Sequence, residues 1–119
     1  MTIDPVALVR RYHAALNRYN AETVKPMFAA DAVYVSPGVS GRIAGRDNII
    51  AAFDAYFAEH PDQRAEDGEI SPVGPLAARS RWRLEATAKS SGRVVSRAGT
   101  ETVTFDAAGR IILVEVEDA

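Results

Sequence analysis

The stretch from Ala78 to Arg110, ARSRWRLEATAKSSGRVVSRAGTETVTFDAAGR, decides the fold because it contains two long runs of alternating side chains. The tripeptide SSG separates the two runs, and the tetrapeptide DAAG follows the second one. A period of two residues, interrupted by glycine-containing turns, is typical of antiparallel strands. We therefore predict strands at about 76–89 and 93–105, preceded by one at 64–72 and followed by one at 110–117.

The alternation also predicts which strand residues face inward. In the first run, Trp82 and Leu84 lie on one face and a row of arginines on the other. In the second run, the apolar residues Val103 and Phe105 indicate the covered face, and Glu101 lies on that same face. The sequence thus predicts a carboxylate inside an apolar interior.

The first half of the chain has helical periodicity. Asp4-Pro5 is a typical helix start, and Pro61 ends the last helical segment because proline cannot continue a helix. Helices gathered first and strands gathered last predict one α+β domain over residues 1–119, with the helices on the concave face of a curved, mainly antiparallel sheet. The predicted elements are a helix from Pro5 to Tyr19, a short helix through 21–31 capped by Asn20 and limited by Pro26, a strand AVYVSP, a short strand within GVSGRIAG, and a helix from Arg46 to Glu59.

Composition narrows the classes of function. Fourteen Lys and Arg against sixteen Asp and Glu give a net charge of −2, so no nucleic acid or membrane surface is expected as a partner. The chain has no cysteine, and its two histidines lack metal-ligand spacing, so neither a metal nor another cofactor is expected. With no apolar run of about 20 residues, we predict a cytoplasmic protein.

Tyr12 is the unusual residue of the first helix. It lies in the middle of an apolar stripe, where a buried hydroxyl needs a hydrogen-bond partner. Tyr12 and Glu101 are therefore both predicted to point into one apolar interior. The neighbouring His13 lies about 100° further around the helix and is interpreted as a rim or surface residue, and His60 as a structural residue at a helix end.

The order of the elements, with MFAADAVYVSPG, AGRDNIIAAF, RWRLEAT and TVTFDAAGRI, resembles the nuclear transport factor 2-like superfamily, specifically its SnoaL-like and ketosteroid isomerase-like members. The resemblance implies a cone in which a bent sheet wraps the first helix around a pocket. It also implies that Tyr12 donates a hydrogen bond to a substrate oxyanion and that Glu101 holds the place of the protonated acid beside it. Ser36 stands where the isomerases carry the carboxylate that removes a proton.

Three functions remain open at this point. The first is a small-molecule pocket protein, an enzyme acting by acid–base chemistry on an apolar carbonyl or enolisable substrate. The second is a non-catalytic ligand-binding or dimerisation module of the same fold. The third is an epoxide-opening or dehydrating enzyme that pairs Glu101 with Arg97 and takes a second acid from Glu115 or Glu117. The predicted pocket walls are Tyr34, Phe53, Phe57, Trp82, Val103 and Phe105.

Each candidate residue also has an ordinary structural interpretation. Tyr12 fits a core tyrosine, Glu101 a partner of Arg97 on the same strand face, and Ser36 a turn residue before Pro37. The outer strand face, with three arginines beside threonines, is either solvated or the contact of a homodimer. Its residues are Arg79, Arg81, Arg83, Thr100, Thr102 and Thr104.

Overall fold

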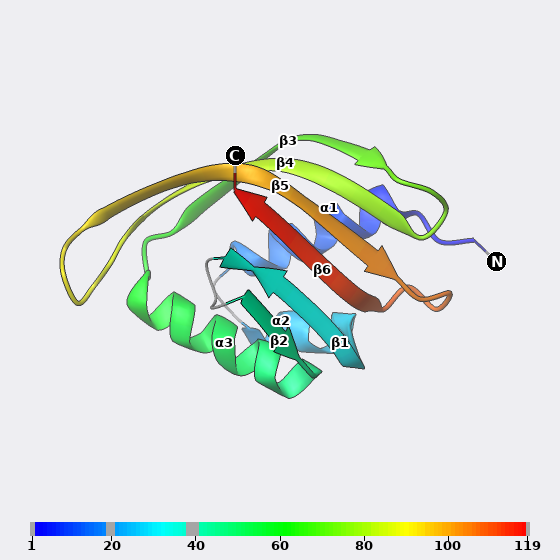
Figure 1. The fold of residues 1–119 in the computed structure, drawn as a ribbon, viewed down its shortest axis with the longest axis horizontal. Coiled ribbons are helices and arrows are strands. Elements are labelled where there is room, and N and C mark those ends of the chain that lie inside the picture. The colour runs from blue at the N-terminus through cyan, green and yellow to red at the C-terminus, as the bar shows by residue number, and fades with distance from the viewer. Residues whose placement is uncertain (1, 19–20, 38–40, 119) are drawn as a thin grey trace.

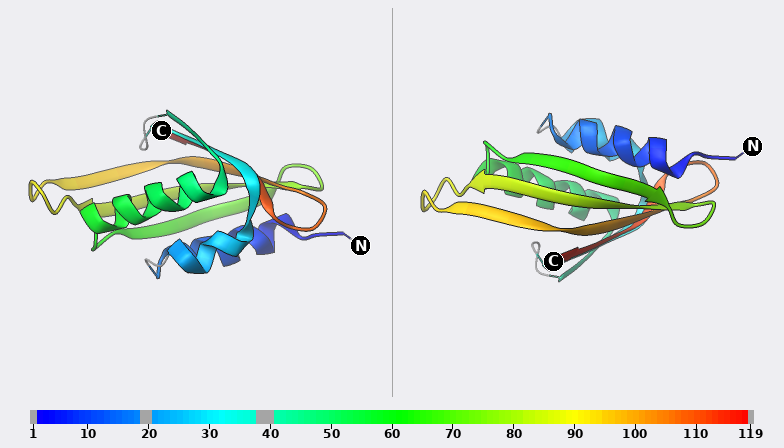
Figure 2. Two further views of the ribbon diagram at one scale, coloured as in Figure 1. Left: turned by 90° about the horizontal axis from the view of Figure 1, so that it is seen from below. Right: turned by 90° about the horizontal axis from the view of Figure 1, so that it is seen from above.

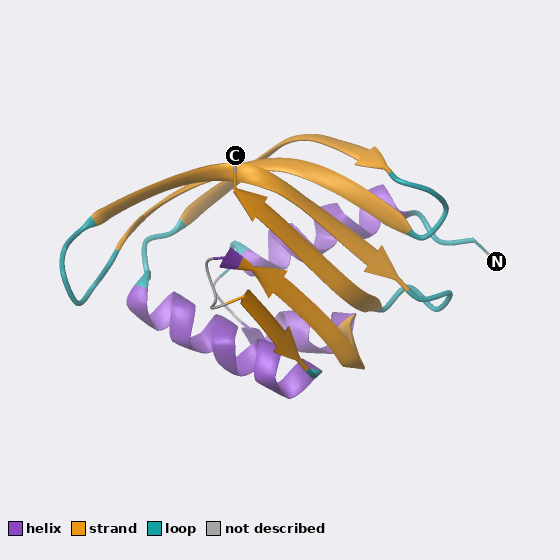
Figure 3. Ribbon diagram, in the orientation of Figure 1, coloured by secondary structure: helices purple, strands orange, loops and turns teal. Residues whose placement is uncertain are grey.

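The computed structural model describes residues 2–18, 21–37 and 41–118, which form one curved sheet with helices on its concave side (Figures 1 and 3). The helical elements are α1 (Pro5–Leu16), α2 (Ala21–Val24), the 3₁₀ turn η1 (Lys25–Met27) and α3 (Arg46–Glu59). The strands are β1 (Phe28–Ser36), β2 (Gly41–Ala44), β3 (Arg64–Pro72), β4 (Ala77–Thr87), β5 (Val94–Phe105) and β6 (Ile111–Asp118).

The sheet order is β2-β1-β6-β5-β4-β3, and all neighbours are antiparallel except the pair β1 and β6. The predicted α+β fold with a mainly antiparallel curved sheet is thus confirmed. The long strands β3, β4 and β5 arch over α1 and α3 (Figure 1). The β4–β5 hairpin extends past the rest of the sheet in both further views (Figure 2).

Helix α1 begins as the sequence predicts and ends earlier. The carboxylate of Asp4 accepts a hydrogen bond from the backbone N–H of Ala7 at 3.2 Å, and Pro5 occupies the first turn. The helix ends at Leu16, three residues before the predicted end. Asn17 caps it, and its side-chain amide donates to the backbone oxygen of Ala65 at 3.3 Å, which ties this end to β3. Tyr19 and Asn20 lie outside the described residues.

The short second helix is also shorter than predicted. Pro26 cannot donate a backbone hydrogen bond, and the chain passes into the turn η1 after only four helical residues. Strand β1 then begins at Phe28, four residues before the predicted start at Ala32. Phe28 pairs in parallel with Ile111 of β6, and the burial of both side chains favours strand over helix.

The predicted inward faces of β4 and β5 are confirmed. Ser80 and Ala86 are buried on β4, as are Glu101, Val103 and Phe105 on β5, whereas the arginines of β4 are exposed. The main core lies between this face and the helices. Its largest fully buried side chains are Val9, Tyr12, Val24, Phe28, Ile49, Val103, Phe105, Ile111 and Val114.

The segment between α3 and β3 is fixed to the β4–β5 hairpin. The backbone oxygen of Glu59 accepts a hydrogen bond from the N–H of Lys89 at 2.7 Å, and its carboxylate accepts one from the N–H of Ser90 at 2.8 Å. Asp62 accepts a further bond from the N–H of Thr87 at 2.7 Å. These bonds hold Gln63, the residue just before β3, in a defined position.

Within the part of the chain that the structure describes, no helix has the length and apolar character needed to cross a membrane.

Candidate active site

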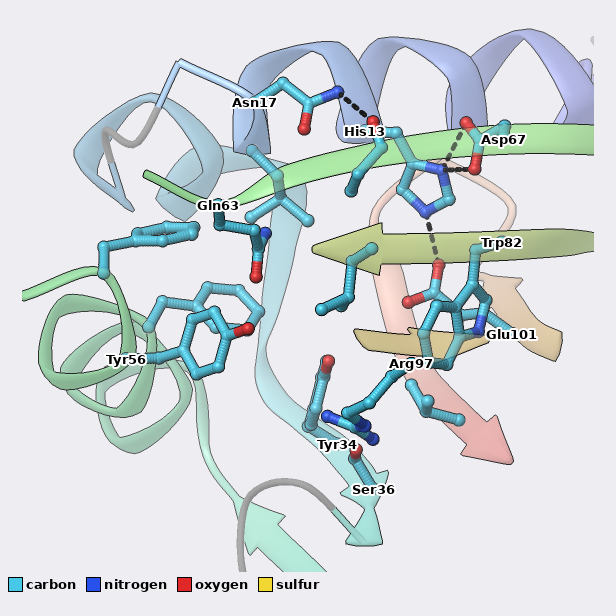
Figure 4. A pocket seen from close by; sticks show the side chains of 16 residues that line it. His13, Asn17, Tyr34, Ser36, Tyr56, Gln63, Asp67, Trp82, Arg97 and Glu101 are labelled. Atoms are coloured by element: carbon cyan, nitrogen blue, oxygen red, sulfur yellow. Dashed lines mark hydrogen bonds and ion pairs between the residues drawn. The ribbon is translucent and has the colours of Figure 1, made fainter. Parts of the chain in front are cut away.

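A cavity lies between the concave face of the sheet, the end of α1 and the side of α3 (Figure 4). Its charged residues come from α1, β3 and β5, and its apolar wall comes mainly from α3, β1 and β4. The charged lining residues are His13, Asp67, Arg97 and Glu101. The others are Leu16, Asn17, Tyr34, Ser36, Phe53, Tyr56, Phe57, Gln63, Ala65, Trp82, Leu84 and Val116.

His13 joins two carboxylates that belong to different strands. Its Nε2 lies 2.5 Å from Oε1 of Glu101, and its Nδ1 lies 2.7 Å from Oδ2 and 2.8 Å from Oδ1 of Asp67. The side chains of His13 and Glu101 are 14% and 9% exposed, and that of Asp67 is 25% exposed. In the described ranges, Oε1 is the only Glu101 carboxylate oxygen with a hydrogen bond, and Figure 4 shows the other oxygen facing the cavity.

The expectation that His13 is a rim or surface residue is wrong. His13 lies one helical turn after the buried Val9, so it shares that residue's side of α1 and meets β3 and β5. Asp67 reaches it because it pairs with Trp82 on the covered face of β4, and a bulge directly follows. Asp67 pairs with Trp82 and Ile70 with Ser80, so β3 carries one extra residue directly after Asp67.

The two carboxylates determine the charge of His13. Burial lowers the pKa of the imidazole, but the charges of Glu101 and Asp67 and the hydrogen bonds to both outweigh that effect and raise the pKa to about 10. At neutral pH His13 is therefore an imidazolium that donates one hydrogen bond to each carboxylate. Glu101 thus accepts from a cation inside an otherwise apolar interior.

Arg97 is held beside Trp82 and turned from Glu101 toward Asp118. Its guanidinium donates to the Asp118 carboxylate at 2.6 Å, and its central carbon lies 5.5 Å from the centre of the Trp82 ring. Gly99, the residue paired with Trp82, allows this arrangement, since an added Cβ would lie 2.9 Å from the indole and closer still to β6. The predicted ion pair between Arg97 and Glu101 is therefore replaced by a pair between Arg97 and Asp118.

The wall opposite the charged residues is aromatic. Tyr34 of β1 meets Phe53 edge to face, with ring centres 5.3 Å apart, and Tyr56 and Phe57 continue this wall along α3. Burial raises the pKa of Tyr34 well above its usual value, with the charge of Glu101 adding to the effect. Tyr34 therefore keeps its proton and can donate a hydrogen bond. The buried Ser36 lies at the same end of the cavity as Arg97 (Figure 4).

The structure places Tyr34, Phe53, Phe57 and Trp82 along this cavity together with Ser36 and Glu101. Val103 and Phe105, expected on the wall, are instead packed in the hydrophobic core, because they pair with core residues of the neighbouring strands, Ala78, Val114 and Ile111. Glu115 and Glu117 point to the outer face of β6 and are exposed. They therefore do not supply the second acid that the epoxide-opening interpretation requires.

Tyr12 lies behind His13 and is not part of the cavity wall. It is 1% exposed, and its ring packs against His13 and Phe28 with ring centres 5.3 Å and 5.6 Å away. Within the described residues its hydroxyl has no hydrogen-bond partner. Burial, with the charge of Glu101 adding, raises the pKa of this hydroxyl well above its usual value. Tyr12 thus supports the imidazole from the core side.

That His13 and Asp67 belong to the site and form a cluster with Glu101 was not predicted from the sequence. A histidine four residues after a buried helical position was the signal for the first. Gly68 inside a predicted strand was the signal for the second, since a glycine there often marks a bulge. In the described residues, no group of three or more His, Asp or Glu side chains is placed to hold a metal ion.

A bent sheet that encloses a cavity with its helices defines the nuclear transport factor 2-like, or cystatin-like, class of small α+β domains. The sequence matches the SnoaL-like domain over residues 9–114, and the chain belongs to this family. Among curated proteins, none matches the chain.

Solved structures agree on the fold. An uncharacterised cystatin-fold protein from Novosphingobium aromaticivorans has a TM-score of 0.85 and 18% identity, with 97% of this chain and 98% of that chain covered. SalBIII, an epoxide hydrolase/cyclase-like enzyme of pyran ring formation in salinomycin, has a TM-score of 0.84 and 17% identity, with 95% of this chain and 88% of that chain covered. Rv0760c from Mycobacterium tuberculosis, in complex with estradiol-17β-hemisuccinate, has a TM-score of 0.82 and 18% identity, with 94% of this chain and 91% of that chain covered.

Proposed function

We propose that this protein is an acid–base enzyme that moves a proton on a small apolar carbonyl or enolisable substrate, with Glu101 as the proton acceptor. One observation carries the proposal: a nearly buried carboxylate has one oxygen bonded to an imidazolium and the other facing an aromatic cavity. Such a carboxylate is positioned next to any apolar ligand that fills the cavity.

In the proposed reaction, Oε2 of Glu101 takes a proton from the carbon next to the substrate carbonyl. The C–H bond breaks, and its electron pair moves to the carbonyl oxygen, which becomes an enolate. Tyr34 donates a hydrogen bond to that oxygen, and the nearby guanidinium of Arg97 stabilises its charge. With a β,γ-unsaturated ketone the enolate is a dienolate, and Glu101 then returns the proton to its γ-carbon, which restores the carbonyl, moves the double bond into conjugation and completes an isomerisation.

His13 and Asp67 act as positioning residues in this scheme. The imidazolium of His13 fixes the orientation of the Glu101 carboxylate and balances its charge, so the carboxylate persists in an apolar interior. Asp67 holds the imidazole from the other side and fixes its direction. This assignment differs from the one implied by the isomerase resemblance, in which Glu101 is a protonated donor and position 36 carries the base.

Isomerisation of β,γ-unsaturated ketones tests the proposal. The probes are 3-cyclohexenone and 5-androstene-3,17-dione, and the conjugated product is followed by its ultraviolet absorbance. We expect the native protein to form product and Glu101→Gln to lose about 10²–10⁴-fold in rate. Glu85→Gln, which alters a carboxylate on the outer face of β4, is the matched control. A native rate equal to that of buffer would favour the alternative, a non-catalytic ligand-binding module.

We also propose that the protein forms a homodimer through the outer face of β4 and β5. This face is polar and its arginines are exposed, with Arg79 already bonded to Thr102 at 3.1 Å and Arg83 paired with Glu66 at 2.9 Å. A two-fold contact here would place these arginines opposite threonines or carboxylates of the second copy and leave the cavity free.

A further inference from the structure

Gln63 carries a buried amide whose carbonyl oxygen has no hydrogen-bond partner among the described residues. The residue is 7% exposed and lines the cavity, and Figure 4 shows its amide pointing into the space beside Tyr56. Within the described residues its Oε1 is buried and has no hydrogen-bond partner. A buried polar group without a partner costs about 1–3 kcal/mol, so its position needs an explanation.

Hydrogen bonds fix the backbone at Gln63 and at the residue before it. Its own N–H donates to the oxygen of His60 at 3.2 Å, and the preceding Asp62 is bonded to the N–H of Thr87 at 2.7 Å. These two bonds fix the backbone at Gln63, from which the side chain extends into the cavity. Asn17, the other amide of the lining, already donates to the Ala65 oxygen.

The Gln63 end of the cavity is chemically distinct from the Glu101 end. Figure 4 shows Gln63 and Tyr56 on one side and His13, Glu101 and Arg97 on the other. The polar groups near this end, the amides of Gln63 and Asn17 and the hydroxyl of Tyr56, are all uncharged. A charged ligand group would lose its hydration there without gaining an opposite charge.

We propose that Gln63 is a specificity-determining residue that binds a neutral oxygen, a hydroxyl or carbonyl, at the end of the substrate remote from Glu101. The inference rests on the proposed function and narrows its substrate class. The substrate is an apolar carbonyl compound that is enolisable at one end and carries a second, uncharged oxygen at the other. An amide suits this task because turning it over offers either an acceptor or a donor.

Binding of a matched pair of ketones tests the inference. 2-Tetralone and 6-hydroxy-2-tetralone differ only in a hydroxyl remote from the enolisable carbon, and calorimetric titration gives the Kd of each. We expect the native protein to bind the hydroxylated compound about 5–20-fold more tightly. Gln63→Leu should reduce this preference to within about twofold while retaining 2-tetralone. A preference that survives in Gln63→Leu would overturn the inference.

The thermal stability of the ligand-free protein gives a second result that does not depend on the probes. Gln63→Leu removes a buried amide oxygen that has no partner among the described residues, and should raise Tm by about 2–6 °C. Asn17→Leu removes an amide that is already bonded and should not raise it. A lower Tm for Gln63→Leu would show that the amide has a structural partner, and the inference would then be wrong.

These outcomes separate the inference from the proposed function. Glu101→Gln should lose isomerisation and keep the preference for the hydroxylated ketone, because it leaves Gln63 unchanged. If neither tetralone binds the native protein, the proposed substrate class is wrong, and the Tm of Gln63→Leu still decides whether the amide is unpartnered.

Discussion

His13 Nε2 lies 2.5 Å from Glu101 Oε1, which joins the first helix of the chain to the fifth strand by a charged hydrogen bond inside the domain. The two positions are 88 residues apart in the sequence, so this is a long-range contact that only the completed fold creates. Asp67, bonded to the other imidazole nitrogen at 2.7 Å, completes the cluster. The stability of the domain and the proposed chemistry therefore depend on the same three side chains.

The first prediction is that stability falls between about pH 6.5 and pH 10. Folding raises the pKa of His13 from 6.5 to about 10, so the folded state binds the proton more tightly. The resulting stabilisation is complete below pH 6.5 and is lost as the pH rises through the folded value. Urea unfolding at a series of pH values measures it.

Two variants isolate the contribution of His13 to this pH profile. His13→Gln should flatten the alkaline decline, whereas His60→Gln, which changes the other histidine, should leave it in place. An alkaline decline that is identical in His13→Gln and the native protein would show that other groups cause it.

Removing only the cation of the cluster should be strongly destabilising. His13→Met leaves Glu101 and Asp67 without the cation that lies between them, and we expect a loss of about 3–5 kcal/mol in the free energy of unfolding. The triple variant His13→Met, Asp67→Leu, Glu101→Met should regain most of this loss, because it removes the unpaired charges as well. A triple variant no more stable than His13→Met would show that packing, rather than charge, causes the loss.

Tyr12→Phe distinguishes the structure-based assignment from the isomerase resemblance. The Tyr12 hydroxyl is buried without a partner in the described residues, so its removal should raise the free energy of unfolding by about 1 kcal/mol. Isomerisation should remain within about twofold of the native rate. A loss of tenfold or more would restore Tyr12 as a direct donor to the substrate oxyanion.

Dimerisation through the outer sheet face predicts a salt-sensitive association. Sedimentation at micromolar concentration should show a dimer, and the double variant Arg79→Glu, Arg81→Glu should dissociate it by placing like charges opposite the acidic groups of the second copy. The same variant should keep its cavity. A monomer at all micromolar concentrations for the native protein would contradict this proposal.

Much of the fold could be predicted from the sequence because its signals are local. The alternation in Ala78–Arg110 specified two strands and their inward faces, and Asp4-Pro5 specified the start of α1. The early start of β1 could not be predicted, because Phe28 enters the sheet only through its pairing with Ile111 at the other end of the chain.

The site was only partly predictable for a related reason. Glu101 was placed inside by the alternation of its own strand. The role of His13 depends on how α1 is rotated against β3 and β5. The inward position of Asp67 was hidden because a bulge breaks the alternation between it and the inward-facing Ile70. Tyr12, the residue that the helical pattern made most conspicuous, is the support behind the imidazole.

The exchange of ketone protons with solvent is a direct test of Glu101 as the proton acceptor, because the exchange requires only that Glu101 removes a proton from the ketone. The measurement follows the loss of the α-proton NMR signals of 2-tetralone in D₂O with catalytic amounts of protein. We predict that the native protein accelerates the exchange and that Glu85→Gln accelerates it equally. With Glu101→Gln the exchange rate should be lower by about 10²–10⁴-fold. Equal exchange with the native protein and with Glu101→Gln would contradict it.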